Sequence, residues 1–175
     1  MTGRAGGAGG ADGLGADASR TYSWVDPARF AAARAEITGR ALLEGLRDGT
    51  IPHPPSCATL NFRVAEVEEN TVTLTAEPGD HQYNAVGSVH GGIVSTWLDS
   101  AMGYAIQSTL EVGESFNTLD LTTRFMRAIR SDTGPVRAVG TVEHRGRTTA
   151  TARGEIRDSD GRLLASGTTT GLILR

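Results

Sequence analysis

Residues 91–110 read GGIVSTWLDSAMGYAIQSTL and predict one long helix at the centre of the fold. Apolar side chains follow helical spacing on two sides of this segment: Ile93, Trp97 and Tyr104 on one side, and Val94, Leu98, Met102 and Ala105 on most of the other. A helix with this pattern has to be buried nearly all round. Small residues such as Gly103 keep it slim, so neighbouring backbone can approach closely.

The sequence on both sides of this helix indicates β-strands. Before the helix, alternating apolar residues predict a hairpin that starts near Leu60 and turns at Glu69-Asn70. After it, four strand-like runs lie at about residues 116–129, 135–145, 148–158 and 162–174. Strands that follow one another directly favour an antiparallel sheet of the α+β class. A single sheet has to curl around the central helix to bury both of its sides.

The chain has 175 residues, which is room for one domain with a normal core. Residues 1–22 are a Gly/Ala-rich tail that we expect to be disordered. Residues 23–53 form an N-terminal helical extension, with an amphipathic helix at about 27–48 that the prolines of IPHPPS (51–56) bring to an end. We expect this extension to cover an edge of the sheet or a pocket mouth. The sheet domain spans residues 54–175.

Charge and cysteine content exclude several classes of function. The 17 basic residues, all Arg, stand against 20 Asp and Glu, so the net charge is −3 and predicts no nucleic-acid or membrane surface. Residues 91–110 are too polar to span a bilayer, and the first twenty residues lack the apolar segment of a secretory signal. A single cysteine, Cys57, excludes an internal disulfide and a Cys-rich zinc site. We expect a cytoplasmic protein.

Asp99 is the only charged side chain in the predicted central helix. Burying a carboxylate without a partner raises its pKa or costs several kcal/mol, so such a group often has a functional role. The alternative is a structural role, in which Asp99 reaches solvent or bonds a neighbouring strand.

The predicted start of the helix, His90-Gly91-Gly92, offers unpaired backbone N–H groups at the positive end of the helix dipole. A carbonyl oxygen that gains negative charge could be stabilised there; alternatively, the glycines only relieve crowding. Gly91 and Asp99 lie roughly 12 Å apart along one helix, too far to act on the same bond. Two copies with antiparallel helices would place Gly91 of one opposite Asp99 of the other. This geometry predicts an obligate dimer.

Two segments, YNAVGSVHGGI (83–93) and WLDSAMG (97–103), resemble the signature of PaaI-type (phenylacetate-pathway) hotdog-fold acyl-CoA thioesterases. The similarity extends from about residue 54 to 174 and includes TLDL (118–121) and DSDGRLLA (158–165). It implies a hotdog fold, in which the curled sheet wraps the central helix. It also implies hydrolysis of an acyl-CoA without a metal or organic cofactor, by a homodimer that assembles into a dimer of dimers, a homotetramer.

The resemblance also implies roles for single residues. Asp99 would be the general base or the nucleophile at the thioester carbonyl, and the Gly91 N–H would polarise that carbonyl, with Gly92 leaving room for the substrate. Asn84 would orient the attacking water or the substrate carbonyl. His90 would shape the loop and contribute hydrogen bonding near the thioester.

Further candidates follow from the same comparison. Thr118 falls where relatives place a residue that positions the nucleophilic water, and Asn117 is its rival. Arg145-Gly146-Arg147 in a turn between strands would bind the CoA phosphates through guanidinium forks and backbone N–H groups. Weaker phosphate candidates are Arg124, Arg127 and Arg130.

Two other functions stay open at this point. One is an acyl-thioester hydratase or dehydratase on the same fold, which would require His90 to act as an acid and base. The other is a module that binds or senses acyl-CoA without catalysis, because a fold does not determine a function.

Overall fold

The computed structural model of the protein describes residues 17–175, so the first sixteen residues of the predicted tail lie outside the described residues. Residues 17–26 run as a segment without regular secondary structure. Arg20 attaches this segment to the body of the protein, because its guanidinium donates hydrogen bonds to the carbonyls of Ala58 and Thr59 at 2.9 and 3.0 Å.

In the described chain, three helices precede the sheet: α1 (Pro27–Ala35), α2 (Gly39–Asp48) and α3 (Pro55–Leu60). The prediction of one helix over residues 27–48 is therefore wrong. The chain starts a new helix at Thr38, whose hydroxyl accepts a hydrogen bond from the Ala41 N–H at 3.3 Å and caps α2. The short α3 was not predicted; it ends at Leu60, where the alternating pattern predicted the start of the hairpin.

Six strands of residues 17–175 form one sheet: β1 (Phe62–Glu68), β2 (Thr71–Ala76), β3 (Ser115–Phe125), β4 (Val136–Arg145), β5 (Thr149–Arg157) and β6 (Leu163–Leu174). Their order is β1-β2-β4-β5-β6-β3, and all neighbours are antiparallel. The predicted antiparallel sheet is thereby confirmed. Two short 3-10 turns lie in the connections, η1 (Asp80–Gln82) and η2 (Ser131–Thr133).

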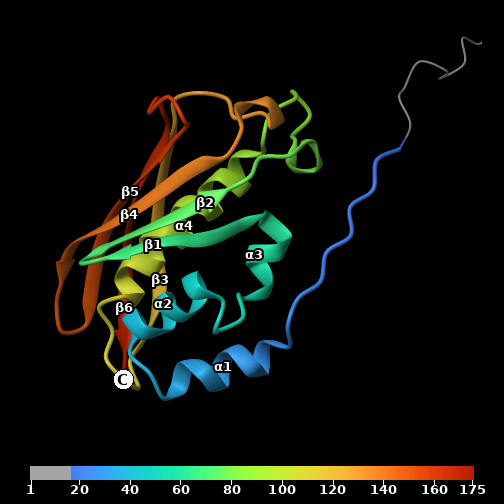
Figure 1. Cartoon of the computed structure of the whole chain (residues 1–175). Coiled ribbons are helices and arrows are strands. Elements are labelled where there is room, and N and C mark those ends of the chain that lie inside the picture. The colour runs from blue at the N-terminus through green and yellow to red at the C-terminus, as the bar shows by residue number, and fades with distance from the viewer. Residues whose placement is uncertain (1–16) are drawn as a thin grey trace, which may run out of the picture.

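The central helix α4 (Gly91–Gln107) lies against the inner face of the curled sheet (Figure 1). Trp97 and Met102 are fully buried between helix and strands. Helix and sheet backbones also meet directly, because a side chain at Gly140 on β4 would lie 2.2 Å from the Ala101 carbonyl oxygen. The curled sheet around a buried central helix, predicted from the apolar pattern, is confirmed.

The helices α1 and α2 differ in how many of their side chains are buried. Leu42, Leu43 and Leu46 of α2 are at most 2% exposed, and α2 packs against β1, which is an edge strand. In contrast, α1 has no buried residue. The second helix of the extension thus belongs to the core, whereas the first lies on the surface.

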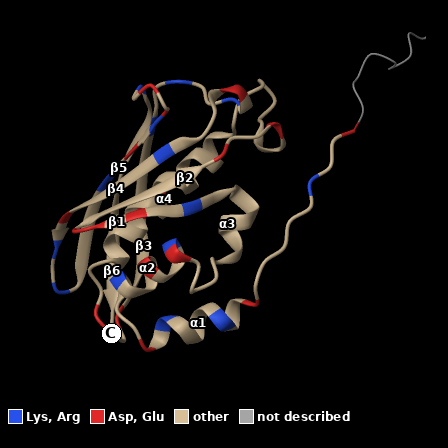
Figure 2. Ribbon diagram, viewed as in Figure 1, with Lys and Arg blue, Asp and Glu red and all other residues tan. Residues whose placement is uncertain are grey.

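Charged residues are spread over the molecule. Figure 2 shows arginines and acidic residues interspersed along helices, strands and loops of the described chain. Many pair locally, such as Arg137 with Glu66 at 2.7 Å and Arg63 with Glu77 at 3.1 Å. Among the helices of residues 17–175, none is long and apolar enough to cross a membrane.

Candidate active site

A pocket of about 300 Å³ opens beside the N-terminus of α4. Gly91 and Asn84 line it, and two loops complete its wall. The other lining residues are mostly apolar: Ser88, Val89, Val94, Phe125, Met126, Arg127, Ala128 and Ile129. A helix end with backbone donors thus borders a largely apolar space.

The first turn of α4 leaves one backbone N–H without a partner. The Gly92 N–H donates to His90 Nδ1 at 2.9 Å, and the next two N–H groups, of Ile93 and Val94, donate to the His90 carbonyl at 2.9 and 3.2 Å. Within the described residues, no acceptor lies against the Gly91 N–H. The helix therefore offers this group, at its positive end, to a ligand in the pocket.

Asn84 shapes the loop that leads into α4. Its Oδ1 accepts hydrogen bonds from the N–H groups of Val86 and Ser88 at 2.9 and 3.3 Å, and its Nδ2 donates to Ser88 Oγ at 3.3 Å. Asn84 thus lies at the pocket, and its carbonyl oxygen is engaged within the loop.

Asp99 lies two turns further along α4 and is half-buried. Thr118 Oγ1 on β3 donates a hydrogen bond to Asp99 Oδ1 at 3.2 Å. Burial raises the pKa of the Asp99 carboxyl, and this effect exceeds the lowering by the Thr118 hydrogen bond. Asp99 is therefore a carboxylate of increased basicity held by one hydroxyl.

A β-bulge in β3 decides which residue faces Asp99. Side chains alternate between the two faces of a strand, and the register of β3 against β6 shifts between Thr118 and Asp120. The extra residue places Thr118 on the same face as Phe125. Asn117, the rival candidate, lies on the opposite face and is exposed.

The side of α4 toward β3 forms a continuous row. Gly91, Ser95 and Asp99 follow at intervals of one turn, and β3 runs along them in the opposite direction. Phe125 lies beside Gly91, and Thr123 Oγ1 is 3.3 Å from Ser95 Oγ. Ser95 thus marks the middle of the row that connects the helix start with Asp99.

The two ends of this row do not form one site within a protomer. Asp99 and Thr118 do not line the pocket that contains Gly91. Asp99 follows Gly91 by eight positions in the helix, roughly 12 Å along the axis. Gly91 and Asp99 therefore cannot act on the same bond within one copy of the chain.

The predicted phosphate-binding turn lies away from the pocket, between β4 and β5. Arg145 is partly buried there and pairs with Glu114 at 2.7 Å, while its guanidinium also donates to the Gly146 carbonyl. The Gly146 N–H is engaged as well, by the Thr149 carbonyl at 2.8 Å. Arg147 is the exposed arginine of this turn.

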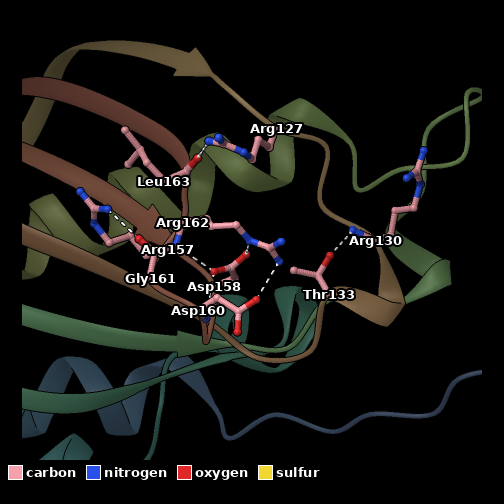
Figure 3. A network of polar contacts seen from close by, with 9 residues as sticks. All are labelled: Arg127, Arg130, Thr133, Arg157, Asp158, Asp160, Gly161, Arg162 and Leu163. Carbon is pink, nitrogen blue, oxygen red and sulfur yellow. Dashed lines mark hydrogen bonds and ion pairs between the residues drawn. The ribbon is translucent and has the colours of Figure 1, made fainter.

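Of the weaker phosphate candidates, Arg127 lines the pocket. Arg127 donates to the Leu163 carbonyl at 2.7 Å, and Arg130 donates to the Gly87 carbonyl at 3.3 Å. Figure 3 shows the two guanidinium groups pointing in different directions, so they do not converge on one ligand. The third candidate, Arg124, is exposed on β3.

The DSDGR segment forms a turn between β5 and β6. The buried Asp158 carboxylate accepts hydrogen bonds from the Asp160 N–H, the Arg162 N–H and Arg162 Nε, at 2.7 to 3.1 Å (Figure 3). Arg162 also pairs with Asp160 at 3.2 Å. These contacts hold the hairpin between β5 and β6.

Cys57 is buried, with Sγ 3.8 Å from the Tyr104 hydroxyl. Burial raises the pKa of the thiol to about 11, so Cys57 is not an activated nucleophile. No group of three or more His, Cys, Asp and Glu side chains comes together as a metal site in residues 17–175.

Comparison with known proteins identifies the family. The sequence profile of the thioesterase superfamily matches residues 86–165, which include Gly91, Asp99 and Thr118. A phenylacetic acid degradation-related protein of Ralstonia eutropha JMP134, described as a proposed thioesterase, is 30% identical, with a TM-score of 0.68 over 74% of this chain and 98% of that one. The chain belongs to the thioesterase superfamily.

Further solved structures agree with this thioesterase assignment. A thioesterase family protein of Silicibacter pomeroyi is 27% identical, with a TM-score of 0.67 over 75% of this chain and 98% of that one. A thioesterase of Haemophilus influenzae, 22% identical, shares the fold with a TM-score of 0.68 over 76% of this chain and 90% of that one. A search of curated proteins finds no match. The PaaI-type resemblance and the thioesterase class predicted from the sequence are thereby confirmed.

Proposed function

We propose that this thioesterase hydrolyses acyl-CoA to a free acid and CoA at a site shared by two copies of the chain. The observation that carries the proposal is the pair of half-sites on α4. One is the unpaired Gly91 N–H at the pocket, and the other is the basic Asp99 carboxylate held by Thr118. The first half supplies a hydrogen-bond donor for the carbonyl oxygen, and the second supplies a base or nucleophile.

The edge strand β3 supports a second copy as the partner. An edge strand presents unpaired backbone groups and favours pairing with another chain. On β3, the apolar side chains of Leu119, Leu121 and Phe125 are 58%, 38% and 55% exposed. Pairing of β3 with the same strand of a second copy would cover these groups and satisfy the edge.

A single two-fold axis can relate both α4 and β3 to the same elements of a second copy. Ser95 lies midway between Gly91 and Asp99 on α4, and Leu121 and Thr122 lie midway between Thr118 and Phe125 on β3. The two midpoints are adjacent in space, because Ser95 contacts Thr123. An axis through this region would bring Gly91 of one copy to Asp99 of the other, and isologous contacts of this kind give two equal sites.

The proposed reaction uses few groups. The thioester carbonyl oxygen accepts a hydrogen bond from the Gly91 N–H, which stabilises the charge that develops on it. Asp99 of the other copy either removes a proton from water that attacks the carbonyl carbon, or attacks it directly. The carbon–sulfur bond breaks, and the thiolate leaves with little need for protonation. In the direct route the attack forms a mixed anhydride between Asp99 and the acyl group, and water then hydrolyses it to the free acid and the Asp99 carboxylate.

Other residues have supporting roles in this proposal. Asn84 forms the loop that carries the Gly91 N–H, and Thr118 holds the carboxylate. Since Glu114 engages Arg145, we assign contact with the CoA phosphates to Arg147 within the predicted turn. We propose a cytoplasmic location, as the single cysteine predicts, and a dimer of dimers, as the sequence resemblance implies.

Thiol release from short, medium, long and aryl acyl-CoAs tests the function. Wild type should turn over one acyl class, and Asp99→Asn should lose about a hundredfold or more of kcat, on the scale of acid–base groups. Arg153→Gln, on the surface of β5, serves as a control. If wild type binds CoA esters but releases no thiol, the protein is a binding module. Equal rates of wild type and Asp99→Asn would assign the base to another residue.

A further inference from the structure

His90 occupies an unusual place for a histidine. It is the N-cap residue of α4, and its Nδ1 accepts the hydrogen bond of the Gly92 N–H at 2.9 Å. Helix N-caps are mostly Ser, Thr, Asp or Asn. An Nδ1 that accepts a hydrogen bond carries no proton, so the proton of the neutral ring is on Nε2. The cap thereby fixes the tautomer of the imidazole.

The cap also decides which N–H group stays unpaired. Through its ring and its carbonyl, His90 accepts hydrogen bonds from Gly92, Ile93 and Val94. Of the first four N–H groups of α4, only that of Gly91 is left. One residue thus satisfies three donors and leaves the fourth at the pocket.

The two glycines fit this arrangement. A Cβ on Gly92 would lie 3.1 Å from Nδ1 and 3.4 Å from Cε1 of His90, so a side chain there would crowd the capping ring. A Cβ on Gly91 would lie 3.3 Å from Cζ of Phe125, whose ring lines the pocket beside the free N–H. Gly92 therefore makes room for the cap, and Gly91 for the pocket wall.

The backbone of His90 is itself held in place. Its N–H donates to the Gln82 carbonyl at 2.8 Å. Gln82 is buried, and its side chain donates to the Leu60 carbonyl at 3.1 Å and accepts from the Gly79 N–H at 3.0 Å. The backbone that carries the capping ring is thus held by a buried residue, whose own side chain is fixed by two hydrogen bonds.

We propose that His90 is a positioning residue that acts as the N-cap of α4 and directs the Gly91 N–H alone toward the thioester carbonyl. This inference rests on the proposed function, in which Gly91 is the donor. Without the cap, the Gly92 N–H is unpaired and the first turn frays, so the Gly91 N–H loses its fixed direction. Loss of the cap therefore raises the energy of the transition state more than that of the bound substrate, because the Gly91 N–H bonds most strongly to the charge that develops on the carbonyl oxygen.

Substitution separates capping from imidazole chemistry. His90→Ala removes both, whereas His90→Asn keeps a strong N-cap without the ring. We expect His90→Ala to lower kcat by about three- to thirtyfold with little change in KM, in line with the loss of an N-cap. His90→Asn should recover most of this rate and of the thermal stability that His90→Ala loses.

Two results would overturn the proposal. If folded His90→Asn is as slow as His90→Ala, His90 acts through its imidazole; if both equal wild type, the cap has no role in turnover. Nitrogen NMR of the wild-type ring gives a readout independent of activity, and a proton on Nδ1 would contradict the cap. Wild type without thioesterase activity would instead refute the proposed function, whereas the tautomer measurement would still test the cap.

Discussion

Gly91 stands at the first position of α4, where a helix tolerates proline well. His90 has φ −58° and ψ 134°, the extended backbone that the residue before a proline requires. Gly91→Pro therefore removes the N–H with little effect on the helix, and Gly91→Ala keeps the N–H but adds a methyl group. We expect kcat of Gly91→Pro to lie about a hundredfold below that of Gly91→Ala in a thiol-release assay, as for one lost oxyanion donor.

Circular dichroism and oligomer size serve as controls for both Gly91 variants. Equal rates of two folded variants would show that the Gly91 N–H does not act in catalysis.

The raised pKa of Asp99 also makes the stability of the folded protein depend on pH. Because burial raises its pKa in the folded protein, the folded state binds this proton more tightly than the unfolded chain does. The free energy of unfolding therefore falls as the pH rises through the interval from the unfolded to the folded pKa. Below that interval both states hold the proton, and the penalty disappears.

Asp99→Asn should accordingly raise Tm by a few degrees at about pH 7, with a smaller gain at about pH 3. Thermal unfolding at both pH values, with wild type alongside, measures this difference. If Asp99→Asn is less stable than wild type at neutral pH, the ionised Asp99 carboxylate does not destabilise the folded state.

At the scale of elements, the sequence predicted those helices and strands whose apolar residues recur at regular spacing. The apolar helix and the alternating strands were found because their patterns report burial directly. The break between α1 and α2 was missed, since Thr38 caps a helix inside a continuous apolar pattern. The contact of Thr118 with Asp99 depends on a bulge, and a bulge arises from the register of β3 against β6, which no local pattern encodes.

The N-terminal helices lead to a prediction about truncation. Leu42, Leu43 and Leu46 of α2 are buried in the core, and each contributes about 1.5–3 kcal/mol through removal from water. A chain that begins at Ile51 should therefore be insoluble or unfolded. A chain that begins at Ile37 loses only α1 and the segment before it, and should keep wild-type kinetics within about twofold, since α1 buries no residue.

Expression, thermal unfolding and thiol release of the two truncated chains measure the contribution of each helix. A chain beginning at Ile51 that is folded and fully active would show that α2 is dispensable. A loss of activity in the longer chain would assign α1 a role at the site.

At the scale of the whole molecule, the central claim is that one active site draws Gly91 and Asp99 from different copies. Gly91→Pro and Asp99→Asn damage opposite halves of that site, so each variant alone should be nearly inactive. In a dimer with one copy of each variant, one site has both intact halves and the other has both defects.

The most direct measurement is thiol release by equal amounts of the two variants after their subunits are dissociated and reassembled together. With random pairing, half of the dimers are mixed and each has one of two sites intact, so about a quarter of wild-type activity should return. Each variant reassembled alone, and wild type treated in the same way, are the controls. Activity no greater than the mean of the two separate variants would contradict a site shared between copies.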